Sequence, residues 1–498
     1  MRRSTLDALA RVAVAVTVAG GLLAAADRTN IRIDLAGSGA ATTASRSLVT
    51  AVELPCPGTE LGGVDGVEDL PTTAQVAAEA APTQALGGLA ARLPAAGSLI
   101  ARDLSGATPR DVAATSREGR LTATLTTPDP LLVLGGGALA PGVVTSAESL
   151  LDTDRVHGLM GLACVPPSAE SWLFGGAAEP GHQERVLLVN TGANPVTVDL
   201  EILGRSGPIE APAAAGLVVP AGGRTTFLLD AVAGGERAPV VHVRTRGGYV
   251  QATLNDYWLD GTTPRGVDDV GGAAPPSVHQ VIPAVPGGLR GSVRVTAVGE
   301  QDALVQVRVI TADGRVALPA AAGVAQVPAG AVREVAFSAL PGDAVALDVT
   351  SDQPIVAAAS TVVSANGVRD FAWSPSTRAI GGLAGTAYPV DSPGHRVRRT
   401  LSLTATAAPA TAQVVLVGAS GVVTERSVEV AGDSVVNISL DGTRAVWVRR
   451  SGGRGELRAG MVSAVGDRGR DGIAARPLTT SRVAAHDLDV IAWDDQTP

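Results

Sequence analysis

Hydrophobic and polar residues alternate along three stretches of the chain that share one pattern, at residues 185–204, 291–314 and 399–421. Each stretch contains an alternating segment, a small or polar turn, a second alternating segment and a turn with glycine. Alternation with a period of two places one side of a strand on a core and the other side in water. The pattern therefore predicts half-buried antiparallel strands, and its recurrence predicts a repeat architecture.

The repeat is long enough for one small β domain. Apolar segments that lead into a pair of prolines begin near residues 51, 162, 280 and 386, roughly 110 residues apart, which is close to the size of one immunoglobulin-like sandwich. The predicted fold is all-β, with about four immunoglobulin-like β-sandwich modules in tandem after an N-terminal hydrophobic helix. A β-propeller is the alternative, and the lack of a visible repeat near about 45 residues disfavours it.

The repeat also predicts where the segments begin and end. The first module is the least regular, because residues 70–100 are rich in Ala, Thr and Pro. The predicted segments are a signal peptide or membrane anchor at 1–26, a linker at 27–47, a degenerate first module at 48–155, and further modules at 156–275, 276–383 and 384–494.

The N-terminus has the features of an export signal. Arg2 and Arg3 precede an apolar run at residues 12–26, and Ala24 and Ala26 form a small-residue cleavage site. The run is shorter than the ~20 residues of a typical membrane-spanning helix. We expect a secretory signal, with a retained anchor as the alternative. Either one predicts an extracytoplasmic protein that is secreted or is held at the membrane by this segment.

Two cysteines occur, Cys56 and Cys164. An even number in an exported chain predicts one disulfide bond between them, and two separate buried thiols are the alternative. The formal net charge of −9 is small for 498 residues and argues against a nucleic-acid-binding protein.

The sequence contains none of the common catalytic motifs. It has no His-Glu-x-x-His and no Gly-x-Ser-x-Gly, and no two of its six histidines have the spacing of a helical metal pair. We therefore assign no catalytic residue, no metal ligand and no cofactor, and we expect the protein not to be an enzyme. The acidic group of Asp256, Asp260, Asp268 and Asp269 leaves a glycosidase or a calcium site as a weaker alternative.

Aromatic residues are rare, at 2% of the chain, and several gather near module ends. Exposed rings at such positions are typical of sugar-binding surfaces, whereas buried rings pack between modules or close the end of a sandwich. Packing is the favoured interpretation. The candidate ligand-binding residues are Trp172, Phe174, Tyr257, Trp258 and Trp373.

Short motifs resemble known sequences. The stretches Asn190 to Pro195, Val219 to Gly222 and Ser351 to Val356 resemble immunoglobulin-like modules of bacterial cell-surface proteins. The Leu-Pro-Cys-Pro motif that ends at Pro57 and the Ser-Trp-Leu-Phe-Gly-Gly motif that follows Cys164 are similar to those of an uncharacterised actinobacterial family of exported proteins. This resemblance implies export and nearly full-length similarity, and it implies no activity.

These observations predict a non-enzymatic protein of the cell envelope that acts as a structural, adaptor or binding scaffold. The first alternative is a carbohydrate-binding protein for cell-wall or capsular polysaccharide, and a glycan-active enzyme ranks below it. The expected partners are cell-wall polysaccharide or another envelope protein. We expect no nucleic acid, and contact with the membrane only through the N-terminal segment.

Overall fold

The computed structural model describes residues 46–61, 72–104, 109–127, 129–177, 181–319, 323–365, 368–389, 396–466 and 471–486. The predicted signal or anchor and nearly all of the predicted linker lie outside these ranges. No helix within them has both the length and the apolar character needed to cross a membrane. Residues 47–485 form one compact unit, which is described below. A separate two-stranded sheet pairs β1 (Arg46–Leu48) with β36 (Ala484–His486).

The first two sandwiches each consist of two antiparallel sheets. In the first sandwich, one sheet has the order β2 (Ala51–Cys56), β7 (Leu131–Gly137), β4 (Gly97–Asp103), β5 (Pro109–Ala114). The other sheet has the order β6 (Leu121–Leu125), β3 (Ala74–Glu79), β8 (Val144–Asp152), β9 (His157–Ala163). This sandwich also contains the short helices α2 (Thr83–Leu86) and η1 (Gly87–Arg92). In the second sandwich, one sheet has the order β10 (Glu170–Phe174), β16 (Val240–Arg246), β12 (Val196–Gly204), β13 (Gly207–Ile209), and β14 (Leu217–Val219) also pairs with β12. The other sheet has the order β15 (Gly223–Leu228), β11 (His182–Asn190), β17 (Gln251–Asp260), β18 (Thr263–Val270). This sandwich also contains η2 (Pro212–Ala214) and α3 (Asp230–Ala233).

The third sandwich is one continuous sheet whose two layers share the 22-residue strand β25 (Ala344–Ala365). The first part of β25 pairs with β19 and β21, and its last part pairs with β20 and β26. Its other strands are β19 (Ser277–Pro286), β20 (Arg290–Ala297), β21 (Ala303–Thr311), β22 (Gly314–Ala317), β23 (Val324–Val327), β24 (Val332–Phe337) and β26 (Val368–Pro375).

The fourth sandwich again has two sheets. One sheet has the order β30 (Val423–Val430), β29 (Ala410–Gly418), β32 (Thr443–Gly453), β27 (Leu383–Ala387), β35 (Thr479–Ser481). The other sheet has the order β31 (Ser434–Ser439), β28 (Val397–Thr406), β33 (Glu456–Val465), β34 (Gly472–Pro477).

Each sandwich encloses its own apolar core, built mainly from Val, Ala and Leu. Small aliphatic side chains fill these cores because the chain has few aromatic residues. The prediction of an all-β chain of tandem sandwiches is confirmed. The alternative, a propeller, is not found among the described sheets, which enclose separate cores.

The two cysteines form a disulfide bond, as the sequence predicts. Cys56 ends β2, and Cys164 directly follows β9, so the bond joins the two sheets of the first sandwich. Both cysteines are buried in the core of that sandwich. Strand β9 lies in the range that the sequence assigns to the second module, but it pairs with β8 and belongs to the first.

Loss of this disulfide is expected to destabilise the first sandwich. It closes a loop with a sequence separation of 108 residues, and removing such a cross-link costs about 2–5 kcal/mol of unfolding free energy. The Cys56→Ala/Cys164→Ala variant is therefore expected to unfold at a lower denaturant concentration than the oxidised protein. Reducing agent should lower the midpoint of the wild type and leave the variant unchanged. Equal midpoints for the wild type and the variant in the absence of reducing agent would contradict the prediction.

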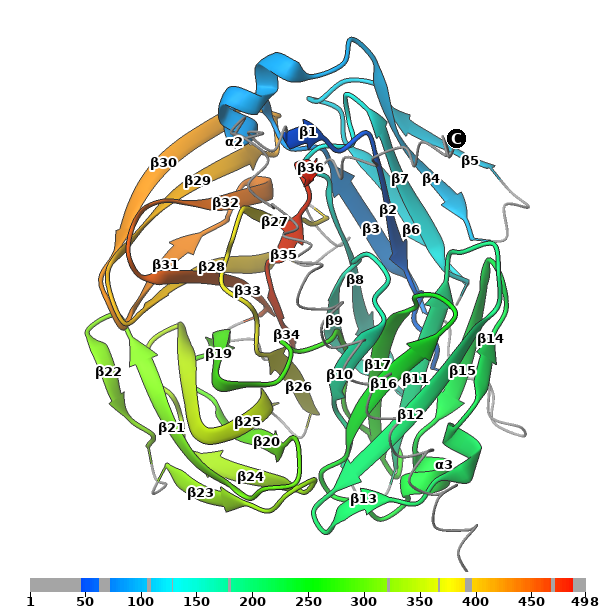
Figure 1. Ribbon diagram of the computed structural model, residues 1–498, viewed down its shortest axis with the longest axis vertical. Coiled ribbons are helices and arrows are strands. Elements are labelled where there is room, and N and C mark those ends of the chain that lie inside the picture. The colour runs from blue at the N-terminus through cyan, green and yellow to red at the C-terminus, as the bar shows by residue number, and fades with distance from the viewer. Residues whose placement is uncertain are drawn as a thin grey trace, which may run out of the picture. The chain divides into compact units, whose positions relative to one another are not determined.

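The four sandwiches meet along one strand from each: β9 contacts β18, β26 and β34, and β26 also contacts β18 and β34. Strands β9, β26 and β34 can be followed together between the sandwiches in Figure 1. Because they are covered on both faces, β9 is buried along almost its whole length, as is the second half of β18. These junction strands therefore differ from the half-buried strands that the sequence predicts at residues 185–204, 291–314 and 399–421.

One carboxylate connects all four sandwiches at this junction. Asp370 of β26 accepts hydrogen bonds from the backbone N–H groups of Leu159 (3.1 Å), Val267 (3.3 Å) and Ile473 (2.7 Å), which belong to β9, β18 and β34. Burial raises the pKa of Asp370 to about 7, against the opposite effect of these donors.

Glycine leaves room for the Asp370 carboxylate. A Cβ atom at Gly158 or Gly266 would lie 2.5 or 2.9 Å from its Oδ1 atom, and both glycines have positive φ angles, of 151° and 131°. A side chain at either position would therefore collide with the carboxylate and also strain the backbone.

A buried ion cluster joins the first sandwich to the fourth. Glu148 of β8 contacts Arg399 of β28 and lies 2.7 Å from the guanidinium group of Arg476 of β34. All three side chains are at most 5% exposed. Burial disfavours the charged form of Glu148, but the two guanidinium groups outweigh this effect and lower its pKa.

Candidate functional site

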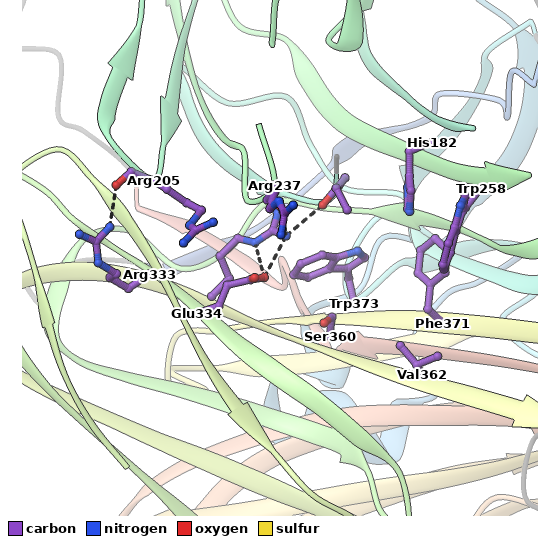
Figure 2. A pocket seen from close by; sticks show the side chains of 13 residues that line it. His182, Arg205, Arg237, Trp258, Arg333, Glu334, Ser360, Val362, Phe371 and Trp373 are labelled. Atoms are coloured by element: carbon purple, nitrogen blue, oxygen red, sulfur yellow. Dashed lines mark hydrogen bonds and ion pairs between the residues drawn. The ribbon is translucent and has the colours of Figure 1, made fainter. Parts of the chain in front are cut away.

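A cavity of about 520 Å³ lies between the second and third sandwiches. Strands β11 and β17 and the segment after β10 line one side, and strands β20, β24, β25 and β26 line the other. Figure 2 shows its two ends. Arg205, Arg237 and Arg333 gather at one end, His182, Trp258 and Phe371 gather at the other, and Trp373 lies between them.

Aromatic rings form the inner part of the cavity. The Trp258 ring is partly exposed and stacks on the His182 ring with a centroid distance of 4.6 Å. Trp373 is 4% exposed, and its indole Nε1 donates a hydrogen bond of 3.1 Å to Asp256. Phe371 lies 6.4 Å from the His182 ring. Packing of two sandwiches therefore fixes these rings before any ligand binds.

Arg294 holds the two sides of the cavity together. Its buried guanidinium group donates to the carbonyl oxygens of Gly175 (2.8 Å), Gly176 (2.9 Å) and Pro239 (2.9 Å) across the interface. It also pairs with Glu334 at 3.0 Å and lies 4.7 Å from the Trp373 ring centroid. The role of Arg294 is structural, and the charge of Glu334 is already offset by this pair.

Two other arginines at the cavity have side chains without a polar partner in the described ranges. The side chains of Arg205 and Arg237 are exposed, and neither guanidinium group has a hydrogen-bond or ion-pair partner within the described ranges. Arg333 is partly buried and donates to the backbone oxygen of Arg205 at 2.6 Å. One end of the cavity therefore presents positive charge that no acidic side chain in the described ranges pairs with.

A histidine and two carboxylates lie at the other end. The Nδ1 atom of His182 is 3.3 Å from Asp256 Oδ1 and 3.7 Å from Glu184 Oε1. Burial, followed by the charge of Asp256, raises the pKa of Glu184 to about 7. Burial acts in the same sense on Asp256, but His182 and the N–H donors of Gly176 and Trp373 outweigh it and lower the pKa of Asp256.

The structure brings only some of the candidate aromatic residues to this cavity. Trp258 and Trp373 line it, whereas Trp172, Phe174 and Tyr257 do not. Trp172 is 3% exposed and stacks on His242 at 3.8 Å, Phe174 is fully buried in the apolar cluster between the sandwiches, and the Tyr257 hydroxyl donates to the carbonyl of Arg155. Packing accounts for these three residues.

The acidic residues that the sequence groups together mostly tie the modules to one another. Asp268 accepts a hydrogen bond from the backbone N–H of Trp373, and Asp269 accepts one from the hydroxyl of Thr59. Asp260 is exposed and pairs with Arg265. None of the four lines the 520 Å³ cavity.

The sequence alone does not indicate several of the residues that form the cavity. Its arginines come from separate loops and strands, and His182 lies 74 residues from Asp256, the carboxylate it contacts behind the cavity wall. No local spacing indicates these groups. The one usable signal is the alternation around His182 and Glu184, which places the two side chains on the same face of one strand.

Comparison with known proteins gives one match. A family model described as a family of unknown function, DUF5719, matches residues 112–441, a span that includes every residue lining the cavity. No curated protein matches the chain. No solved structure matches it either. The matched span exceeds half of the 498 residues and includes the cavity and the sandwiches around it, so the chain belongs to the DUF5719 family, whose function is unknown.

Proposed function

We propose that the protein is a non-enzymatic binding scaffold of the cell envelope, and that the cavity between the second and third sandwiches takes an acidic sugar of an envelope polysaccharide. The main support for this proposal is that Arg205 and Arg237, whose guanidinium groups have no polar partner in the described ranges, line the same cavity as the fixed aromatic rings. Guanidinium groups bind carboxylates and phosphates in a bidentate manner, and apolar rings with a few placed polar groups are typical of ligand sites.

Three further features support the proposal. The disulfide fits an oxidising, extracytoplasmic compartment. The Asp370 hydrogen bonds and the Glu148 ion cluster hold the sandwiches in a fixed arrangement. A rigid binding site loses less conformational entropy when a ligand binds. Asp268 and Asp269 accept hydrogen bonds from neighbouring groups, so they are poorly placed to act as the acid and base of a glycosidase.

We expect the Arg205→Ala/Arg237→Ala variant to bind a glucuronic-acid oligosaccharide at least about 100-fold more weakly than the wild type, measured by calorimetry at low salt. Each charged hydrogen bond contributes about 1.5–3 kcal/mol, and about 1.4 kcal/mol corresponds to a tenfold change in affinity. Arg246→Ala is the matched control, because Arg246 is an exposed arginine of the same sandwich that pairs with Asp199 outside the cavity.

The uncharged oligosaccharide of the same length should bind weakly to all three proteins. Equal binding of charged and uncharged sugars, or an equal loss in the Arg246→Ala control, would contradict the assignment of the arginines. The sugar should be recovered intact after prolonged incubation, and reproducible cleavage by the wild type would contradict the non-enzymatic role.

A further inference from the structure

We propose that His182, Glu184 and Asp256 bind one divalent metal ion, of which Zn²⁺ is the best fit, in the wall of the cavity. This inference goes beyond sugar binding and does not depend on it. The ligand atoms offered by the three side chains all lie within 4.8 Å of one another. Zinc binds nitrogen and oxygen ligands at about 2.0–2.2 Å, which places tetrahedral ligand atoms about 3.3–3.6 Å apart. The 3.3 and 3.7 Å distances from His182 Nδ1 to the two carboxylates are close to this range.

The strand pairing makes this geometry rigid. His182 and Glu184 are two residues apart on β11, so their side chains lie on one face of the sheet. Asp256 on β17 is the direct cross-strand partner of Glu184, and Trp258 is that of His182. All three proposed ligands therefore come from two hydrogen-bonded strands, which position side chains more accurately than loops do.

Outer hydrogen bonds orient the carboxylates. Asp256 Oδ2 accepts from the Gly176 N–H at 2.7 Å and from the Trp373 indole at 3.1 Å, which leaves Oδ1 directed at His182. Glu184 Oε1 accepts from the Ala177 N–H at 3.0 Å. Supporting hydrogen bonds of this kind are typical of metal sites, where they fix the direction of the ligand atoms.

A second cavity provides an independent observation. It has a volume of about 200 Å³ and is lined by His182, Glu184, Asp230 and Glu236, among others. The Oδ1 atom of Asp230 is buried and has no hydrogen-bond partner among the described residues. Acidic groups thus face His182 and Glu184 from α3 as well as from β17. The guanidinium group of Arg185 offsets part of the charge of Asp230, and a bound cation would offset more of the negative charge around His182.

The residue set also indicates the kind of metal. One imidazole and two carboxylates suit zinc better than calcium, which prefers six to eight oxygen ligands. Three protein ligands leave a fourth position for water or for a ligand group. His182 lines both cavities, so this position has access to open space.

The test titrates Zn²⁺ into the untagged full chain after treatment with a chelator, using calorimetry and tryptophan fluorescence. We expect one equivalent to bind and the fluorescence of Trp258 to change, because its ring stacks on His182. His182→Asn and Glu184→Gln should each weaken binding at least tenfold. Glu184→Gln keeps the size of the side chain, so it tests the site even where His182→Asn fails to fold.

His242→Asn is the matched control. His242 also stacks on a tryptophan, Trp172, and also contacts two carboxylates, those of Glu170 (2.7 Å) and Glu201 (3.1 Å). These carboxylates contact opposite ring nitrogens, so no single ion can reach both carboxylates and one nitrogen. The control should bind Zn²⁺ like the wild type. A wild type that binds no Zn²⁺ at micromolar concentration, or an equal loss in the control and in Glu184→Gln, would overturn the metal site and leave the sugar-binding proposal untouched.

Discussion

Replacement of Asp370 by alanine is expected to lower the free energy of unfolding by about 3–9 kcal/mol. The substitution leaves three buried backbone N–H groups, those of Leu159, Val267 and Ile473, without the acceptor they have in the structure. Each unsatisfied buried donor costs about 1–3 kcal/mol. Because the donors belong to the other three sandwiches, the loss should spread beyond the sandwich that carries the mutation.

Denaturant unfolding and amide hydrogen exchange measure this prediction together. The Leu159, Val267 and Ile473 amides should lose protection in the Asp370→Ala variant. Asp313→Ala is the control, because Asp313 is an exposed turn residue of the same sandwich. A variant that unfolds like the control, or that loses protection only within residues 277–375, would show that Asp370 does not join the sandwiches.

The pH dependence gives a second measure of the same carboxyl group. Its pKa is about 7 in the folded protein and about 3.8 without the fold, so the folded state binds its proton more tightly. The contribution of Asp370 to stability is therefore complete below about pH 4, decreases as the pH rises to about 7, and is constant above that. Glu79, whose pKa burial raises to about 7, acts in the same direction.

Between pH 5 and 7 the stability of the wild type should decrease with rising pH more steeply than that of Asp370→Asn. The difference corresponds to one proton, or about 1.4 kcal/mol per pH unit at most. Parallel curves for the two proteins would contradict the assigned shift.

Replacement of Glu148 by alanine is expected to cost about 3–5 kcal/mol of unfolding free energy. It leaves the guanidinium groups of Arg399 and Arg476 buried without their counter-charge, and an uncompensated buried charge is one of the most destabilising changes in a protein. The loss should appear at the junction of the first and fourth sandwiches, because Glu148 belongs to one and the arginines belong to the other.

A triple replacement separates charge from packing at this cluster. The Glu148→Leu/Arg399→Met/Arg476→Met variant removes all three charges at similar volume, and it should recover most of the stability lost in Glu148→Ala. Glu425→Ala is the control, since Glu425 is exposed and bonds only to Gln413 among the described side chains. Thermal unfolding of the four proteins decides the matter: a Glu148→Ala variant as stable as the control would contradict a structural role for the ion cluster.

Much of the fold follows from the sequence because its strands alternate. β12 and β21 bury every second residue along most of their length, and this pattern can be read directly from the side chains. The junction strands cannot be recognised in this way. Asp370 and Arg476 have the sequence character of solvated positions, yet both are buried, because their partners lie on strands more than 100 residues away.

The candidate site was predictable only in part, for the same reason. Trp258 and Trp373 are conspicuous in a chain poor in aromatic residues, and they do line the cavity. Trp172 and Tyr257 are equally conspicuous but do not line the cavity. The arginines and His182 acquire their significance only when two sandwiches face each other, and no local pattern encodes that contact.

The shared carboxylate also restricts how this chain can change in length. In a simple string of domains, a unit can be duplicated or deleted without disturbing the others. Here, deleting any one sandwich removes either the acceptor itself or one of the groups that it satisfies, and an extra copy finds no vacant place beside Asp370. Gene rearrangements that add or remove whole units should therefore be selected against, and variation in size should be concentrated in surface loops.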